Sequence, residues 1–305
     1  MKKYLVSVLL LHGLTNIFGQ IDIATSSAEI SGFWNKGDSR VYTISEEKYN
    51  ATDGDTTSYE FVNYKVDIRI VDSSPNSYTI EWSYRDYVII TDNPLHKKMT
   101  YLLEGKKVII KTDKKGSFIE VVNWKDFKEL ISKTSSMLKT DFPNLKEKKG
   151  VVKLVKEAYS SKEVIEKAAI KEIKQFYIFH GGKYKLDEQL VGKTTVPNYS
   201  GKKPFDAKYS LSLDEIDLLG FNSVIRLKQE VDSKQVTDAL YARLSNVYDK
   251  SEATMPSRED FPPVTSTIRY ASRIHNEGWV VFSIRTEETS WKNQFSFSSR
   301  TIAIQ

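Results

Sequence analysis

Apolar and polar residues alternate strictly along two neighbouring stretches, "YKVDIRIV" and "YTIEWSY". The apolar positions are Tyr64, Val66, Ile68 and Ile70 in the first stretch and Tyr78, Ile80, Trp82 and Tyr84 in the second. A period of two residues predicts strands that bury one face. The segment between them, residues 72–77, consists of Asp, Ser, Pro and Asn residues and has the composition of a turn. The pattern therefore predicts a long antiparallel hairpin with one buried face.

Shorter stretches of strand character follow on both sides of a central polar region. Gly116 and the segment 276–278 are the turns that separate some of these strands. The strands are expected near residues 100–104, 106–112, 117–122, 182–196, 206–220, 221–231, 279–287 and 295–305.

The period changes from two to that of a helix in three places. After "SFIEVV", Asn123 is a good N-cap, and a helical stripe follows it. Residues 139–181 are rich in lysine and glutamate and indicate further helices, with a break at Pro143. A last helix is expected after Asp232 or Ser233, either of which can cap it. The stripe after Asn123 contains Trp124, Phe127, Ile131 and Leu138, with Leu130 beside them.

This order of elements predicts an α+β fold with one or more large, curved antiparallel sheets and three to four helices. A duplicated half-barrel-like unit is an open alternative, because two hairpins in the two halves have a similar form. The chain divides into a signal peptide, a flexible leader, an N-terminal β-rich half with a helix, a helical connection and a C-terminal β-rich half with a helix. Their ranges are 1–19, 20–32, 33–140, 141–182 and 183–305.

The N-terminus has the layout of a secretory signal peptide. Lys2 and Lys3 precede the apolar run "YLVSVLLL", and Gly19 is a plausible last residue before cleavage. We therefore expect export to the periplasm or the cell exterior. No later stretch has the length of a transmembrane helix, so a transmembrane protein is not expected.

Composition narrows the chemistry further. The chain has no cysteine, which excludes disulfides and thiol chemistry. Loss of residues 1–19 removes two lysines and no acid, so the formal net charge falls by two from +5. The basic residues alternate with acids, and no nucleic-acid partner is expected. The sequence has no phosphate-binding or dinucleotide-binding glycine pattern, and no cofactor is expected.

Four segments together resemble uncharacterised secreted proteins of about 300 residues from Gram-negative bacteria. They are "FWNKGDSRVYTI", the predicted hairpin from "YKVDIRIV" through its turn to "SYTIEW", "GSFIEVVNWKDF" and the closing "GWVVFSIRTEE…SSRTIAIQ". A curved sheet with helices is also similar to the half-barrel of periplasmic lipoprotein carriers. That likeness implies a concave apolar face that holds acyl chains. The chain differs from those carriers in its length and its long central helices.

The candidate ligand-binding residues are aromatic. Tyr64, Tyr78, Trp82 and Tyr84 share one predicted sheet face. Such a face favours either burial against helices or a groove for an apolar or carbohydrate ligand. Asp53 and Asp55 flank Gly54 and form a weak calcium candidate, although Asp and Gly are also what a plain hairpin turn requires.

Catalytic patterns are sparse. His96, His180 and His275 lie far apart beside turns, and solvent-exposed loop histidines are expected. Asp214, Glu215 and Asp217 form an acidic run. The preferred hypothesis is thus a non-enzymatic exported protein, with a binding or structural role, whose partner is an apolar ligand, a glycan or another envelope protein. The alternative is a secreted glycan or ester hydrolase that uses acids such as Asp214 and Asp217.

Overall fold

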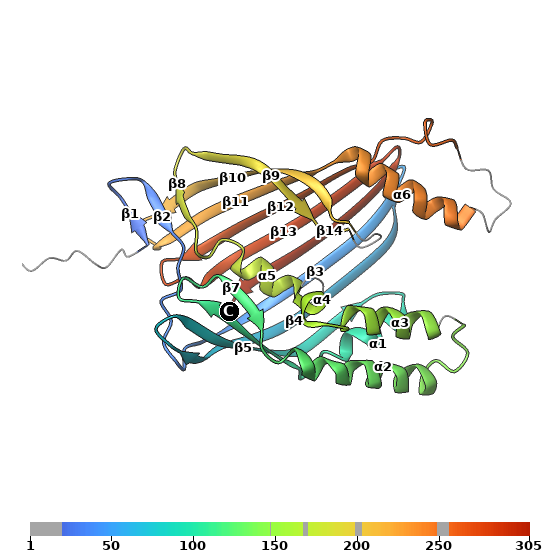
Figure 1. Cartoon of the computed structure of the whole chain (residues 1–305), viewed down its shortest axis with the longest axis horizontal. Coiled ribbons are helices and arrows are strands. Elements are labelled where there is room, and N and C mark those ends of the chain that lie inside the picture. The colour runs from blue at the N-terminus through green and yellow to red at the C-terminus, as the bar shows by residue number, and fades with distance from the viewer. Residues whose placement is uncertain (1–19, 147, 167–169, 199–202, 249–255) are drawn as a thin grey trace, which may run out of the picture.

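A single large antiparallel sheet dominates the structure (Figure 1). The computed structural model describes residues 20–146, 148–166, 170–198, 203–248 and 256–305. Eleven strands hydrogen-bond in the order β7-β6-β5-β4-β3-β14-β13-β12-β11-β10-β9. Their bounds are β3 Ser39–Thr52, β4 Asp55–Ser73, β5 Ser77–Ile90, β6 Lys107–Asp113, β7 Phe118–Val121, β9 Gln189–Val196, β10 Phe205–Asp217, β11 Asn222–Val231, β12 Thr265–His275, β13 Val280–Trp291 and β14 Gln294–Ile304.

The sheet consists of two meanders joined at the middle. One runs from β3 to β7 and the other from β9 to β14, with each strand beside the next in sequence. The two meanders join where β3 pairs with β14. In this pairing, Ile44 of β3 lies opposite Ile302 of β14. The edges β7 and β9 are therefore connected by the central helical region, which has to pass from one edge to the other.

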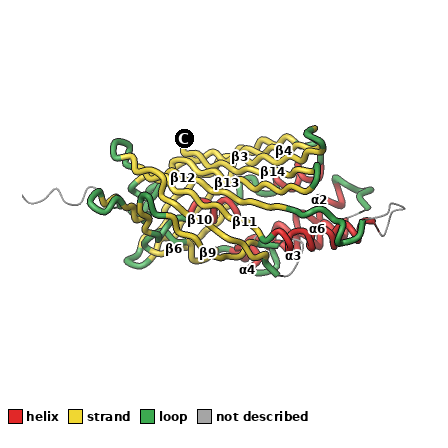
Figure 2. Tube along the Cα trace, turned by 90° about the horizontal axis from the view of Figure 1, so that it is seen from above, coloured by secondary structure: helices red, strands yellow, loops and turns green. Residues whose placement is uncertain are grey.

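The helices lie together on one side of β3, β4 and β14 (Figure 2). Within the described residues they are the 3₁₀ helix η1 and six α-helices, more than the three to four expected. No helix in this part of the chain is both long and apolar enough to cross a membrane. The bounds are α1 Pro94–Tyr101, η1 Trp124–Phe127, α2 Lys128–Thr140, α3 Lys148–Ala158, α4 Lys162–Val164, α5 Lys171–Tyr177 and α6 Ser233–Tyr248.

The predicted hairpin is confirmed. β4 and β5 pair over most of their length, with Ile68 opposite Trp82, and both side chains are fully buried. The α+β class and the large antiparallel sheet are likewise present. The expected signal peptide, residues 1–19, lies outside the described residues.

Residues 20–32 were expected to form a flexible leader, and this prediction is wrong. They form β1, Ile21–Asp22, and β2, Ser27–Glu29, which join β8, Lys183–Lys185, in a small second sheet. Ala28 and Ile30 are almost completely buried. The small residues suggested a linker, but in fact they allow this segment to pack closely against the core.

The strand expected at residues 100–104 is also absent, because α1 occupies the start of that region and a turn follows it. Asn93 Oδ1 accepts hydrogen bonds from the backbone N–H groups of Leu95 and His96, and Pro94 begins the helix. Asn followed by Pro is a helix-start signal that outweighs the apolar run after it.

Asn123 does not cap α2. Its Oδ1 accepts the Ile109 N–H at 2.8 Å, and its Nδ2 donates to the Lys107 carbonyl at 3.0 Å. The side chain therefore continues the hydrogen bonding of β6. In α2 and the preceding turn, the buried stripe contains Phe127, Leu130 and Leu138, while Ile131 is only half-buried.

The predicted cap of the last helix is correct. Asp232 Oδ1 accepts the Gln235 N–H at 2.9 Å at the start of α6. Beneath this helix, Val196, Ala207, Val231 and Ile268 form a small apolar cluster, separate from the main core. The second half of the sheet thus has its own minor core.

Candidate functional site

The four predicted ligand-binding aromatics lie on one sheet face, deep in the main core. Tyr64, Tyr78, Trp82 and Tyr84 are all at most 6% exposed. Trp82 packs edge-on against Phe176 of α5, with 5.3 Å between ring centroids. The Tyr78 hydroxyl donates to the Gly32 carbonyl at 3.0 Å. A ligand could reach these rings only if α5 moved, so their binding role gains no support here and stays a prediction.

Beside these aromatics, a charged cluster joins α5 to the sheet. The Tyr84 hydroxyl donates to Glu172 Oε1 at 2.5 Å, and Arg300 Nε donates to Glu46 Oε1 at 3.0 Å. Burial raises the pKa of Glu172 above its usual range. Burial would also raise the pKa of Glu46, but the charge of Arg300 and its hydrogen bond outweigh this and lower it.

This cluster is best understood as a structural anchor. Arg300 and Glu172 are both buried, and each already has a partner within the protein. Gln175 Nε2 adds a further hydrogen bond from α5 to the hydroxyl of Ser283 at 3.1 Å. Breaking such a network would leave buried groups unpaired, and this cost holds α5 against the sheet.

The weak calcium candidate is a tight turn between β3 and β4. Asp53 and Gly54 both have positive φ, as a two-residue hairpin turn of the I′ type requires. Asp53 Oδ1 accepts a hydrogen bond from Asn293 Nδ2 at 2.7 Å. Within the described residues, no cluster of three or more His, Cys, Asp or Glu has the geometry to hold a metal.

The acids of the hydrolase alternative are occupied by structural bonds. Asp217 Oδ1 accepts the N–H groups of Leu219 and Gly220 at 3.1 and 2.9 Å. The Gly220 hydrogen bond is the main reason that the pKa of Asp217 is lowered. Asp214 is bonded to Arg226 and to the Ser212 hydroxyl. A general acid needs a raised pKa, so this geometry does not favour the hydrolase alternative.

His180 differs from the expectation of a solvent-exposed histidine. It is 7% exposed, and its Nε2 lies 2.8 Å from the Gly278 carbonyl oxygen. Burial lowers its pKa to about 4. Gly116, with φ of +88°, leaves space for it, because a Cβ there would lie 2.7 Å from the imidazole Cδ2. The glycine-rich turns therefore form a tightly packed corner of the core around this ring.

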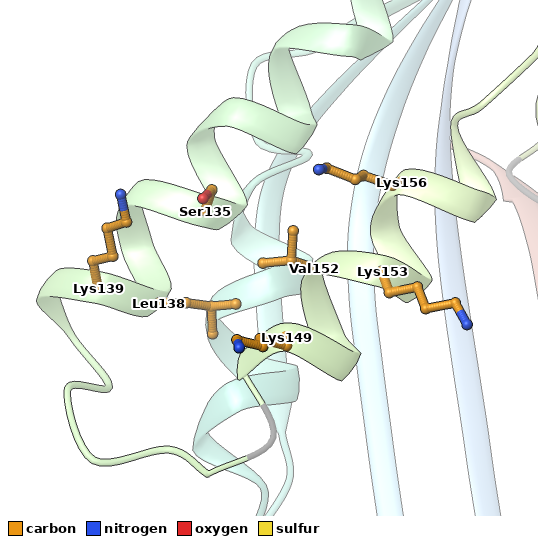
Figure 3. Close-up of a pocket in the computed structure, with 7 residues that line it drawn as sticks. All are labelled: Ser135, Leu138, Lys139, Lys149, Val152, Lys153 and Lys156. Carbon is orange, nitrogen blue, oxygen red and sulfur yellow. The ribbon is translucent and has the colours of Figure 1, made fainter.

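A cavity of about 480 Å³ lies between α2 and α3 (Figure 3). Leu138 and Val152 point toward one another across it, and Lys156 points toward α2. Lys153 points away and forms an ion pair with Glu157 at 3.8 Å. The complete lining is Ser135, Leu138, Lys139, Lys149, Val152, Lys153 and Lys156.

The cavity combines an apolar floor with a positive rim. Leu138 is 1% exposed, so the floor belongs to the buried interface of the two helices. Four lining residues are lysines and none is acidic. From its lysine- and glutamate-rich sequence, this stretch is expected only to connect the two β-rich halves. The spacing of Lys149, Lys153 and Lys156 beside Val152 was the available signal, since residues three and four apart lie on one helix face.

Comparison with known proteins gives little further guidance. No family model matches the sequence, and no curated protein matches it. Among solved structures, the chain is matched to a porin-like protein from Bacteroides uniformis ATCC 8492 with 9% identity. That match covers 86% of this chain and 95% of the other, but the TM-score is 0.17. So low a score establishes no shared fold.

Proposed function

We propose that this protein is an exported, non-enzymatic binding protein that holds an amphiphile with an anionic head group between α2 and α3. The proposal rests on the cavity of about 480 Å³, which has an apolar floor and four lining lysines, of which Lys153 points away and is paired with Glu157. Its volume is in the range of small-molecule sites, about 300–1,000 Å³. The site is built on two helices rather than on the strand aromatics.

The lining favours this ligand class for a physical reason. Val152, which is half-buried above Leu138, offers apolar surface to a hydrocarbon chain, which gains free energy when it leaves water. Lysine ammonium groups at the rim would hold a phosphate, sulfate or carboxylate while their stems cover the chain. Because no lining residue is acidic, an amphiphile with a cationic head would meet only repulsion.

The proposal keeps the acyl-chain ligand class that the resemblance to lipoprotein carriers implies, although α5 fills the aromatic sheet face in this protein. Export through the expected signal peptide would bring the protein to the envelope, where anionic amphiphiles are abundant. Acyl-chain binding in this protein would thus use the helical layer rather than the filled sheet face.

Calorimetric titration with three detergents of equal chain length tests the proposal. We expect saturable binding of dodecyl phosphate, weaker binding of neutral dodecyl maltoside and no binding of dodecyltrimethylammonium. All titrations stay below the critical micelle concentration. Equal affinity for the three head groups, or no saturable binding of any, would disprove the proposed ligand class.

Matched variants locate the site. The double variant Lys149→Gln/Lys156→Gln removes two rim charges, and we expect about tenfold weaker binding of dodecyl phosphate. The control Lys97→Gln/Lys36→Gln removes two charges from exposed lysines outside the cavity and should bind normally. Equal loss in both double variants would indicate a general charge effect and not this cavity.

A further inference from the structure

The edge strand β9 has a free side. Among the described residues of the large sheet it pairs only with β10, and its burial pattern shows five exposed residues out of eight. Leu190 and Val191 are 42% and 70% exposed, which is unusual for apolar side chains at a sheet edge. Every second residue of such a strand directs its backbone N–H and C=O outward, where another strand can pair with them.

The outer face next to this edge is positively charged. Lys193 of β9 lies directly opposite Lys208 of β10, and Lys228 of β11 lies opposite Ser210. Like charges directly opposite one another destabilise a sheet. Glu230 of β11, the one acid in the lining of the cavity here, lies opposite Lys208, and Lys228 Nζ already bonds it at 2.6 Å, so three lysines share one acid. An added negative charge would relieve the remaining repulsion.

A cavity of about 420 Å³ lies at the same place. Val191, Lys193, Lys208 and Lys228 are among its lining residues. The edge thus presents an apolar side chain and a lysine two positions apart on one face, beside a hollow that can receive a side chain. These features are independent of the cavity between α2 and α3.

A second copy of this chain is a poor occupant. Residues 189–196, "QLVGKTTV", contain a lysine and no acid. Antiparallel pairing of two β9 strands near their centres would bring the two Lys193 side chains together, and this would add to the repulsion. Charge complementarity instead requires a strand that carries carboxylates.

We propose that β9 is a docking edge for an extended acidic segment of a partner protein, which adds to the sheet as an antiparallel strand. The partner residue opposite Lys193 would be Asp or Glu, and the residue opposite Val191 would be apolar. An antiparallel partner strand runs opposite to β9, so along its sequence it lies opposite Lys193 before it lies opposite Val191. Its sequence would therefore carry Asp or Glu two positions before an apolar residue. Main-chain hydrogen bonds supply affinity, and these two positions supply specificity.

Amide hydrogen exchange and fluorescence anisotropy on the full chain test this edge. The probe is an eight-residue peptide of threonine and valine with one glutamate two positions before a valine. A second peptide has lysine in place of the glutamate, and a third is N-methylated at alternate residues. We expect the glutamate peptide to bind with protection of the β9 amides, and the other two to bind at least tenfold more weakly.

A charge exchange makes the test specific. Lys193→Glu should lower the affinity for the glutamate peptide about tenfold and allow the lysine peptide to bind. Lys97→Glu makes the same change at an exposed lysine outside this cavity and should leave both peptides unaffected. The proposal is overturned if the affinity for the glutamate peptide is the same in Lys193→Glu as in the unaltered protein, or if the N-methylated peptide binds equally well. A dimer, seen by sedimentation, in which β9 is protected without any peptide also overturns it.

Discussion

The two edges of the large sheet differ in what lies beside them. At β7, the side chain of Glu166 accepts the Val121 N–H at 2.8 Å, and Lys162 forms an ion pair with Glu120. The segment around α4 therefore covers this edge. At β9, no strand pairs with the free side in the described part of the chain, and a lysine cluster lies beside it.

This difference follows from what each edge is connected to. β7 is short and leads into the helices, which fold back across the buried sheet face, and Glu166 from this region accepts the Val121 N–H. β9 begins only after those helices have ended, so no helix follows it directly to cover it. Natural sheets protect edges either by covering them or by placing charge on them, and this protein uses one device at each edge.

The largest expected loss of stability comes from a substitution in the main core, in β5 near the covered edge β7. Trp82→Ala removes a fully buried indole that packs against Phe176 and Tyr177. We expect a loss of about 4 kcal/mol in the free energy of unfolding, measured by urea denaturation. Val191→Ala at the open edge should cost less than about 0.5 kcal/mol. Similar losses at both positions would contradict the contrast between the two edges.

The stability of the protein should also depend on pH through His180, which packs beside Gly116 in the turn between β6 and β7. The folded pKa of His180 is about 4, below the ordinary value of 6.5. As pH falls through 6.5, the unfolded chain takes up a proton and the folded chain does not, so stability falls until about pH 4. The expected loss over this window is about 3 kcal/mol, measured by urea denaturation at a series of pH values.

Two variants distinguish the contribution of His180 to this loss of stability from that of carboxylates protonated in the same pH range. His180→Gln removes the titration and should flatten the decline between pH 6.5 and 4, although the variant starts from a lower stability. His275→Gln makes the same change at a half-buried histidine and should keep the original slope. If both variants keep that slope, another group causes the decline.

The hydrogen bond that covers β7 is tested by Glu166→Ala. Loss of the carboxylate leaves the Val121 N–H without its acceptor, and we expect about 1 kcal/mol lower stability. Hydrogen exchange at Val121 should become faster. Glu163→Ala, an exposed acid in the same segment, is the control and should leave that amide protected. Unchanged exchange in Glu166→Ala would show that this side chain does not cover the edge.

Strand periodicity predicted the sheet well, because alternation along β4 and β5 is a local property that burial of one face enforces. The failures were of two kinds. Asn93-Pro94 was a local helix signal that the neighbouring apolar residues concealed. Residues 20–32 carried no local signal, since Ala28 and Ile30 are buried only through their pairing and packing with distant segments.

The candidate site could be predicted only in part. Periodicity placed the four aromatics on one sheet face, but it cannot tell a face covered by α5 from an open groove. The cavity between α2 and α3 depends on how two helices pack, and sequence alone does not give their separation. Likewise, His180 lies beside glycines that suggested an exposed turn, whereas Gly116 in fact makes room for the buried ring.

The smallest expected effect has the opposite sign from the others. Lys193→Gln removes a like-charge pair across the open edge, and we expect stability to rise by about 0.3 kcal/mol at low ionic strength. The gain should shrink in about 0.5 M salt, where screening already weakens the repulsion. At the covered end, Lys107→Gln removes the Lys107–Glu81 ion pair, with a distance of 3.0 Å, and should lower stability slightly. If Lys193→Gln also lowers stability, the lysine cluster imposes no cost on the free protein, and relief of repulsion cannot be what attracts an acidic strand to β9.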